Sequence, residues 1–125
     1  MSIKVMLADD HVLMREGIRQ LLEFDGSIEV IAEANDGEEC IEKLKTVHPQ
    51  ILLLDINMPN MNGFKVLDIM ERRCWLDEIP VIVISSESDT LFVRRAYNLG
   101  ATDYIARPFD AAIVQRRVEN ILRLY

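Results

Sequence analysis

The sequence predicts an α/β fold in which a parallel β-sheet is covered by helices on both faces. Short apolar runs alternate with amphipathic segments five times along the 125 residues, a pattern typical of successive βα units. Residues 51–55 read Ile-Leu-Leu-Leu-Asp and are followed by the loop-forming residues Pro59, Asn60 and Gly63. A short strand without polar alternation is buried on both faces, as in parallel sheets.

The first unit combines a strand over residues 3–8 with a helix that runs to about Phe24. We expect Asp10 to cap this helix, because an N-cap aspartate accepts hydrogen bonds from unpaired backbone amides. Gly17 lies inside the helix at a cost of about 1 kcal/mol relative to alanine, and close packing against the sheet would explain it. Four apolar residues at helical spacing are predicted to face the sheet: Met14, Ile18, Leu21 and Leu22.

The second unit begins with residues 28–34, which are polar enough for an edge strand. Asn35 or Asp36 caps the following helix, which runs to about Val47 with Ile41 and Leu44 facing inward.

The remaining three units follow the strand at residues 51–55. A helix starts at Asn62 and Gly63, and strand 81–85 follows Pro80. Helix 88–99 stops at Gly100, which suits a left-handed C-terminal position, and leads into strand 102–105. The last helix follows Asp110. The inward residues of the third helix are predicted to be Phe64, Leu67 and Met70, and those of the last helix Val114, Val118, Ile121, Leu122 and Tyr125.

These five units contain no repeat, low-complexity segment or linker, so residues 1–125 are predicted to form a single domain. Right-handed crossovers leave few topologies. The common one is the flavodoxin-like (βα)5 three-layer sandwich with strand order 2-1-3-4-5. In that order the first and third strands are neighbours, and ligands bind outside their carboxyl ends.

Composition narrows the function classes. The formal net charge of −7 disfavours direct binding to nucleic acid phosphates. No apolar run reaches the roughly 20 residues of a membrane helix, and the first residues lack the features of a secretory signal. Cys40 and Cys74 have no metal-binding spacing, so we expect a reduced, cytoplasmic protein.

Polar side chains follow four of the predicted strands at their carboxyl ends. Asp9 and Asp10 follow the first strand, Asp55 ends the third, Ser85 ends the fourth and Arg107 follows the fifth. Three nearby carboxylates repel one another unless a cation joins them, and oxygen ligands suit Mg²⁺. Asp55 can also act as a nucleophile that forms an acyl phosphate, with a hydroxyl and a cation neutralising the phosphoryl oxygens.

Four sequence blocks carry a specific resemblance over essentially the whole chain. They are residues 8–10 (Ala-Asp-Asp), 54–63 (Leu-Asp-Ile-Asn-Met-Pro-Asn-Met-Asn-Gly), 80–86 (Pro-Val-Ile-Val-Ile-Ser-Ser) and 100–109 (Gly-Ala-Thr-Asp-Tyr-Ile-Ala-Arg-Pro-Phe). In this order and spacing they resemble the receiver domain of a two-component response regulator. The resemblance implies a signalling protein without enzymatic turnover of its own, whose partner is a histidine kinase or phosphotransfer protein.

The same resemblance implies a role for each acidic residue. Asp55 is the phosphoacceptor. Asp10 and Asp55 bind Mg²⁺ through their side chains and Asn57 through its backbone carbonyl, whereas Asp9 acts mainly through water.

The resemblance also implies a switch. Ser85 binds a phosphoryl oxygen and Tyr104 swings inward, which alters a surface formed by helix 88–99, strand 102–105 and the last helix. Homodimerisation through that surface and an effector domain outside the given residues are compatible with this view. Glu87 and Asn57 flank the site, where the family controls access of the hydrolytic water.

Arg107 departs from the family pattern, in which lysine precedes the proline. The charge is kept, but a planar guanidinium differs in geometry from an ammonium group. The alternative function is therefore a phosphorylation-independent interaction module with the same fold. A haloacid-dehalogenase-type phosphatase is disfavoured, because such enzymes need a second aspartate two residues after the first, where this chain has Asn57.

The two halves of the chain resemble different receivers. Residues 9–17 resemble receivers attached to helix-turn-helix domains, and the part from Trp75 onward resembles receivers of cyclic-dinucleotide enzymes. A recombined or engineered chain would show such a mixture.

Several of these residues also have a plain structural interpretation. Ser85 could belong to a turn, Tyr104 could be an ordinary strand aromatic, and Arg107 could pair at the surface with Asp103 or Asp110. His11 is interpreted as a solvated or capping residue.

Overall fold

Five parallel strands form one sheet in the order β2-β1-β3-β4-β5. The computed structural model describes residues 2–24, 26–86, 89–107 and 110–124. This strand order confirms the predicted flavodoxin-like topology, in which right-handed crossovers bring β1 and β3 side by side. The strands are β1 (Ile3–Ala8), β2 (Ile28–Ala34), β3 (Ile51–Asp55), β4 (Val81–Ser85) and β5 (Asp103–Ala106).

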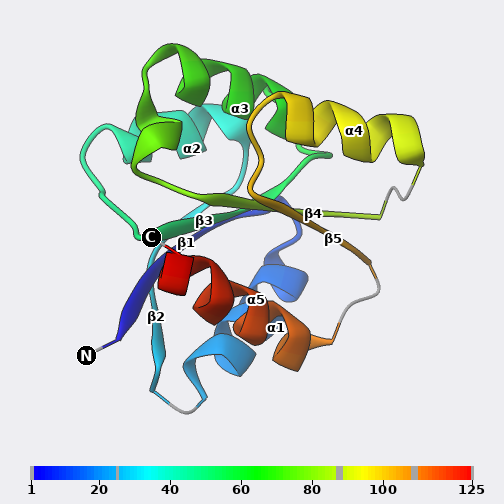
Figure 1. Cartoon of the computed structure of the whole chain (residues 1–125). Coiled ribbons are helices and arrows are strands. Elements are labelled where there is room, and N and C mark those ends of the chain that lie inside the picture. Colours follow the sequence, from blue (N-terminus) through cyan, green and yellow to red (C-terminus); the bar gives the residue numbers. More distant parts are fainter. Residues whose placement is uncertain (1, 25, 87–88, 108–109, 125) are drawn as a thin grey trace.

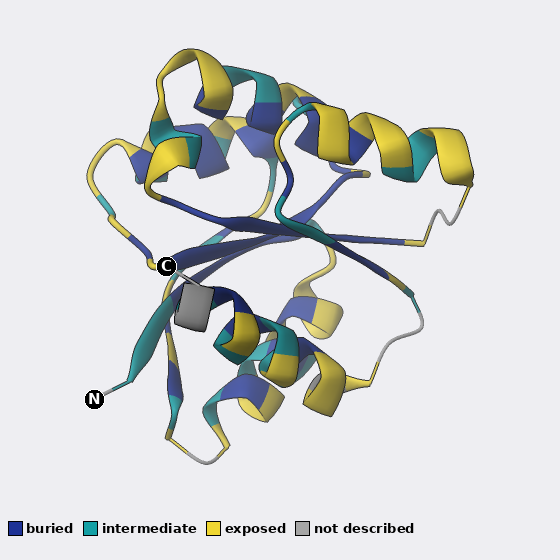
Figure 2. Cartoon of the chain, in the orientation of Figure 1, coloured by how far each residue is buried: buried dark blue, intermediate teal, exposed yellow. Residues whose placement is uncertain are grey.

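Helices cover both faces of the sheet, so the molecule has three layers (Figure 1). Two helices pack on one face and three on the other, and each side has its own apolar cluster. Figure 2 shows that buried residues line the strands and the inner helix surfaces, while exposed residues lie on the outside. The helices of one face are α1 (Val12–Glu23) and α5 (Ala111–Leu124), and those of the other are α2 (Gly37–Leu44), α3 (Gly63–Arg72) and α4 (Thr90–Asn98), with a short 3-10 helix at Trp75–Asp77.

Strand β3 lies at the centre of the sheet, and all five of its residues are buried. It pairs with β1 on one side and β4 on the other, which explains why its sequence shows no polar alternation. Strand β2 is an edge strand, as predicted, and its burial alternates in part.

Helix α1 differs most from its prediction. It begins at Val12 with His11 at the N-cap, so the expected capping by Asp10 is wrong. The cause is a tight turn in which the backbone amide of His11 donates to Asp9 Oδ1 at 2.9 Å. The inward stripe is also partly wrong, because Ile18 is buried with Leu22 whereas Met14 and Leu21 are 42% and 56% exposed.

The third inward position of α1 belongs to Arg15, which is buried and was not predicted to be. Close packing at Gly17 is wrong too, because a Cβ built there would meet nothing within 4 Å.

The other elements agree with their predictions apart from small shifts at their ends. Asp36 caps α2, as one of the two expected residues, but the helix ends at Leu44, three residues before Val47. There the chain tightens, and the amide of Thr46 donates to the Lys43 carbonyl oxygen. Strand β5 starts one residue late. Gly100 adopts a φ of 108°, as expected for its role after α4.

The predicted apolar faces of α2, α3 and α5 are confirmed for Ile41, Leu44, Phe64, Leu67, Met70, Val114, Val118 and Ile121, with Leu122 packed against the same core. Helix α4 begins at Thr90 with Asp89 as its N-cap. The proposed start at Ser88 and the predicted inward Tyr125 lie outside the described residues.

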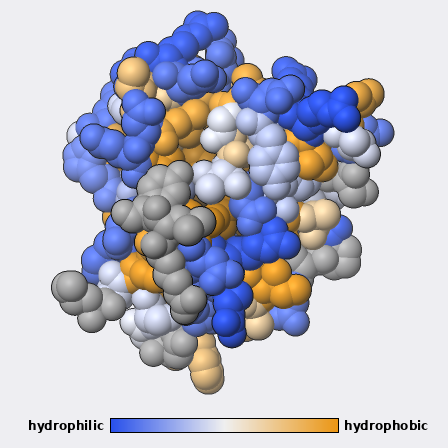
Figure 3. All heavy atoms as spheres, viewed as in Figure 1, coloured by the Kyte–Doolittle hydropathy of each residue, from blue (hydrophilic) through white to orange (hydrophobic). Residues whose placement is uncertain are grey.

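On the face seen in Figure 3, hydrophilic side chains cover the helices, and apolar side chains are visible mainly between them. Within the part of the chain that the structure describes, no helix combines the length and apolarity needed to cross a bilayer.

Candidate functional site

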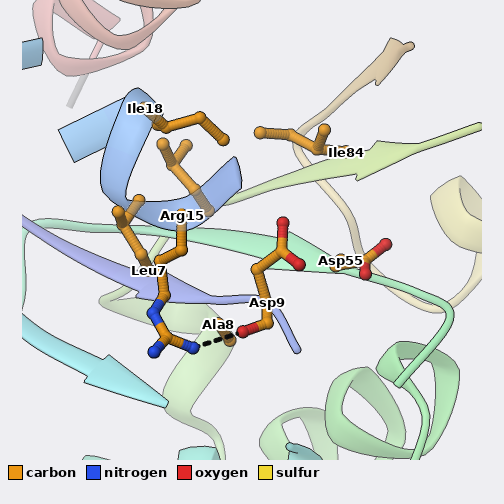
Figure 4. Close-up of a pocket in the computed structure, with 8 residues that line it drawn as sticks. Leu7, Ala8, Asp9, Arg15, Ile18, Asp55 and Ile84 are labelled. Carbon is orange, nitrogen blue, oxygen red and sulfur yellow. Dashed lines mark hydrogen bonds between the residues drawn. The ribbon is translucent and has the colours of Figure 1, made fainter. Parts of the chain in front are cut away.

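The parallel register places Asp9 and Asp55 at the same edge of the sheet. Ala8 on β1 pairs with Leu54 on β3, so the next residue of each strand is an aspartate. Both carboxylates are buried, with 5% and 3% of their surface exposed, and Figure 4 shows them on neighbouring strand ends. Asp10 follows in the loop and is only partly buried. The structure therefore brings the three predicted acids together.

Arg107 reaches this acidic cluster from the end of β5. Its Nη2 donates to Asp9 Oδ2, and its Nη1 lies 3.9 Å from Asp55 Oδ1. The main ion pair is therefore with Asp9. The surface pairing considered for Arg107 is wrong, because its side chain is only 13% exposed and Asp103 pairs with Arg117 at 2.8 Å.

Asp55 is the least compensated carboxylate of the cluster. Burial raises the pKa of the Asp55 carboxyl to about 6, and the negative charge of Asp9 adds to this rise, whereas Arg107 opposes it. The amide of Asn57 approaches Asp55 Oδ1 at 3.4 Å. The other oxygen, Oδ2, is buried without a hydrogen-bond partner in the described structure. Asp55 thus presents one free oxygen at the strand end.

A small cavity lies next to the two buried carboxylates. It has a volume of about 10 Å³ and lies between α1 and the sheet, with Asp9 and Asp55 at its margin (Figure 4). Most of its lining is aliphatic, so it offers Asp55 little polar compensation. The other lining residues are Leu7, Ala8, Arg15, Ile18, Leu53 and Ile84.

The loop after Asp55 depends on Gly63. A Cβ at that position would lie 2.7 Å from the Asp55 carbonyl oxygen, too close for any other residue without backbone movement. The Gly63 amide also donates to the Ile56 carbonyl oxygen at 2.9 Å. This contact folds the loop back onto the strand end and keeps Asn57 beside Asp55. The residue type at position 63 therefore follows from the site's geometry.

Ser85 and Tyr104 both lie on strands next to the acidic cluster. Ser85 is fully buried at the end of β4, and its carbonyl oxygen accepts a hydrogen bond from the Arg107 amide at 2.7 Å. Tyr104 is buried at 9% exposure in the apolar cluster under α2, α3 and α4. Glu87, which was expected to flank the site, lies outside the described residues.

Arg15 is a residue of this region that the sequence interpretation missed. Its guanidinium donates to the carbonyl oxygen of Asp9 (dashed in Figure 4) and to that of Ala34. It also binds Glu33 Oε1 and Asn35 Oδ1, each at 2.9 Å. These bonds tie the acidic loop to the end of β2. Its spacing to Ile18 and Leu22, at i+3 and i+7, was the signal that places it on the inner face.

The donor atoms of the cluster fit a hard divalent cation. One ligand atom from each of Asp9, Asp10, His11 and Asp55 lies within 4.8 Å of the others. Among the described residues, neither Asp10 Oδ1 nor Asp55 Oδ2 accepts a hydrogen bond, although both are buried and His11 Nδ1 lies 3.1 Å from Asp10 Oδ1. Carboxylate oxygens without partners gain a large compensating interaction from a cation such as Mg²⁺. The site can therefore hold a metal next to the buried carboxylate of Asp55.

Comparison with known proteins agrees with this geometry. The sequence profile described as "Response regulator receiver domain" matches residues 5–119. The transcriptional regulatory protein DegU of Brevibacillus brevis is 34% identical over 88% of this chain and 46% of its own length. A protein-glutamate methylesterase/protein-glutamine glutaminase of Carboxydothermus hydrogenoformans is 43% identical over 86% of this chain and 30% of its own length. The chain thus spans less than half of these two relatives.

Solved structures show the same similarity in three dimensions. The receiver domain of the putative response regulator NarL from Mycobacterium tuberculosis superposes with a TM-score of 0.89 at 30% identity, covering 98% of this chain and 97% of that one. The chain also matches a structure of the CheX-CheY-BeF3-Mg²⁺ complex from Borrelia burgdorferi, with a TM-score of 0.86 and 32% identity over 96% of this chain and 89% of that one.

Proposed function

The chain belongs to the response regulator receiver domain family, and on this premise we propose that Asp55 is its phosphoacceptor. The chain is thus a receiver domain of a two-component signalling system. The observation that carries the assignment to Asp55 is its buried Oδ2, which has no hydrogen-bond partner among the described residues and lies beside two further carboxylates and a guanidinium. The phosphate mimic and Mg²⁺ named for the Borrelia complex support the same chemistry. We take residues 1–125 as one such domain.

The proposed reaction is a phosphoryl transfer to carboxylate. An Asp55 oxygen attacks phosphorus, the bond from phosphorus to the donor histidine nitrogen breaks, and the imidazole leaves with the bonding electron pair and takes up a proton. The product is an acyl phosphate on Asp55. Burial favours this step, because a poorly solvated carboxylate is a stronger nucleophile than a hydrated one. Beyond this transfer and the hydrolysis of the product, we propose no turnover for the receiver alone.

Each neighbouring side chain has a proposed role in this transfer. Mg²⁺, held by Asp10, Asp55 and the Asn57 carbonyl with Asp9 in support, would supply positive charge to the phosphoryl oxygens. The Ser85 hydroxyl would bind one of these oxygens. Arg107 holds Asp9 in the present structure, and its Nη1 is near enough to Asp55 to reach a phosphoryl group with a small movement.

The switch proposed for this domain uses Ser85 and Tyr104. Ser85 would move toward the phosphoryl group, and Tyr104 would report that movement to the surface of α4, β5 and α5. This surface carries the exposed apolar residues Leu91, Tyr97 and Ile113, which suit a changing protein contact. We propose it as the contact for an effector domain or a second copy of the chain. The names of the two relatives, a transcriptional regulatory protein and a methylesterase, describe activities of proteins more than twice as long as the part that matches this chain.

The donor partner is proposed to be a histidine kinase or phosphotransfer protein that docks beside α1. The first turn of α1 exposes Val12 and Leu13, at 59% and 90%, directly after the acidic loop. A partner that covers these apolar side chains would place its phosphohistidine near Asp55. A cytoplasmic location, in keeping with the free Cys40 and Cys74, is part of the same proposal.

The test is phosphorylation by a small acyl phosphate. Incubation of the chain with acetyl phosphate and Mg²⁺ should add one phosphoryl group, detected by intact mass, and EDTA should prevent it. Asp55→Asn should abolish the addition, whereas Asp68→Asn, which changes a partly exposed carboxylate on α3, should not. Equal labelling of the parent and Asp55→Asn, or no labelling of the parent, would contradict the proposal.

A further inference from the structure

Helix α1 exposes more large apolar side chains than any other helix in the described part of the chain. Leu13 and Phe24 are each 90% exposed, and Leu21 is 56% exposed. Phe24 follows the last residue of α1 and keeps a helical backbone, so its side chain continues the same helix surface. Single exposed apolar residues are ordinary, but a contiguous group of them marks a contact with another molecule.

These side chains form one uncharged face of the helix. At 3.6 residues per turn, six residues fall within an arc of about 120° on the side turned away from the sheet. They are Leu13, Met14, Gly17, Gln20, Leu21 and Phe24. The arc contains no charged residue, although 28% of the residues of the chain are charged. This face therefore suits an apolar contact better than an electrostatic one.

Gly17 lies in the middle of this face, and nothing within the chain requires a glycine there. Its φ is not positive, and a Cβ built on it would meet nothing within 4 Å. Glycine inside a helix is less stable than alanine. A glycine also lets another backbone approach closely, so a helix from outside the chain would explain the residue.

We propose that this face is the contact between two copies of the chain, whose α1 helices pack antiparallel across a two-fold axis at Gly17. Leu13 and Leu21 lie four residues on either side of Gly17, about 6 Å along the helix axis. A two-fold axis at Gly17 therefore places Leu13 of one copy against Leu21 of the other, twice. Such self-complementarity is what a two-fold contact needs, whereas an unrelated partner does not require it.

This inference goes beyond the proposed function and does not depend on phosphorylation of Asp55. A phosphoryl donor that reaches Asp55 has to cover only the start of α1. Phe24 lies about 16 Å further along the helix, so the donor leaves that end of the face unexplained. A second copy covers the whole face, including Leu13, and so excludes the proposed donor. Self-association should therefore slow transfer from a protein donor but not from acetyl phosphate.

Sedimentation equilibrium of the whole chain tests the contact. One helix from each copy buries less than about 1,200 Å², the range of weak association, so we expect a reversible dimer at concentrations on the order of 100 μM. Leu13→Glu and Phe24→Glu should each weaken it at least about tenfold, because a charge would be buried without a partner. The matched control is Leu91→Glu on α4, at a leucine that is 71% exposed, and it should leave the dimer unchanged.

Gly17→Ala gives a second readout, because its effects on the monomer and on the dimer have opposite signs. The added methyl group should raise the melting temperature at low protein concentration, since alanine favours the helix. It should weaken the dimer at least about tenfold, because it forces apart two helices in close contact. Unchanged association of Gly17→Ala would contradict close approach at this residue.

Cysteine cross-linking tests the antiparallel arrangement. The Cys74→Ser background removes the exposed thiol, and Cys40 is buried. With diamide as the oxidant, a mixture of Leu13→Cys and Leu21→Cys should form more disulfide-linked dimer on a non-reducing gel than either variant alone.

Four results would overturn the inference. They are a parent that stays monomeric at about 500 μM, above the weak-association range expected here, unchanged association of both glutamate variants of α1, loss of association in Leu91→Glu, and stronger cross-linking of one cysteine variant alone than of the mixture. In each case acetyl phosphate should still label Asp55, so these results are distinct from a failure of the proposed function.

Discussion

Helices α1 and α3 each follow a strand that carries site aspartates, yet they bury different kinds of residue. Helix α3 follows β3 and buries an apolar face that includes Phe64, Leu67 and Met70. Helix α1 follows β1 and buries Arg15 with two aliphatic residues, while Leu13 and Leu21 are exposed. The difference shows that an apolar pattern determines packing only where no charge has to be satisfied nearby.

The physical reason lies in what each helix faces. The α3 side of the sheet meets a continuous apolar cluster, so burial of aliphatic surface is the largest gain. The start of α1 faces the carbonyl oxygens of Asp9 and Ala34 at the strand ends, and Glu33 beside them. Leaving these acceptors buried without donors would cost more than exposing a leucine, because an unsatisfied buried polar group costs about 1–3 kcal/mol.

The largest expected effect comes from removing one leucine from each helix. Leu67→Ala on α3 should lower the free energy of unfolding by about 4 kcal/mol, because this fully buried side chain leaves a cavity. Leu21→Ala on α1, at an exposed position, should change it by less than about 0.5 kcal/mol. Urea denaturation followed by circular dichroism measures both, and similar losses would remove the contrast between the helices.

Arg15→Met should lower the free energy of unfolding by about 3 kcal/mol, because the methionine fills the space but removes the side-chain donor of the Asp9 carbonyl oxygen and of Glu33 Oε1. Arg19→Met is the matched control, since Arg19 binds the same Glu33 from a side chain that is 40% exposed, and it should cost at most about 1 kcal/mol. Equal stability of Arg15→Met and the parent would contradict the prediction, because it would mean that the hydrogen bonds of Arg15 do not stabilise α1.

The pH dependence of stability should reflect Asp55 in the absence of metal. Its folded pKa of about 6 exceeds the unfolded value near 3.8, so the folded state binds more protons between these values. The contribution of Asp55 to the free energy of unfolding should therefore fall as pH rises from about 4 to 6, by roughly 2 to 3 kcal/mol, which is read as the difference between the parent and Asp55→Asn. In EDTA, Asp55→Asn should be more stable than the parent at about pH 7.5 and similar to it at about pH 4.

Added Mg²⁺ should reduce that difference at neutral pH, because a cation stabilises the charged form of Asp55 in the folded state. Urea denaturation of both proteins at the two pH values, with and without metal, measures these differences. A parent whose stability rises over the same pH interval by more than that of Asp55→Asn would contradict the raised pKa.

The smallest expected effect is at Gly17. Gly17→Ala should stabilise the protein by about 1 kcal/mol, since the residue lies within α1 and the added methyl group meets nothing within 4 Å. Gly63→Ala is the contrasting change at the start of α3, where the methyl group would meet the Asp55 backbone, and it should destabilise. Thermal denaturation distinguishes the two, and a destabilised Gly17→Ala would mean that α1 packs more closely than the structure shows.

Much of the fold could be predicted because its signals are local. The apolar run of β3, the Asp36 cap and the left-handed Gly100 each depend on a few consecutive residues. The errors arose in helix α1, where polar partners rather than the apolar pattern decided the outcome. Helix α1 begins after His11 because Asp9 occupies its amide, and Met14 is exposed because the third inward position belongs to Arg15.

For the candidate site, the sequence predicted which residues are present but not which of them interact. The presence of Asp9, Asp10, Asp55, Ser85 and Arg107 at strand ends followed from the strand pattern, and the structure brings them to one edge. The strand pattern did not predict which of these side chains form ion pairs. The strand pattern does not identify the partner of Arg107, and only the folded chain shows that it is mainly Asp9.

The sequence by itself determined the order of strands and helices, the parallel sheet and the carboxylate at the end of β3, because hydrophobic periodicity and turn residues act over short distances. The tertiary structure decided the partners of each charge. It placed Arg107 against Asp9, left one oxygen of Asp55 without a hydrogen-bond partner in the described part of the chain, and brought His11 to the edge of the cluster. Electrostatic pairing depends on separations of a few ångströms between residues far apart in the chain, and these exist only once the sheet has formed.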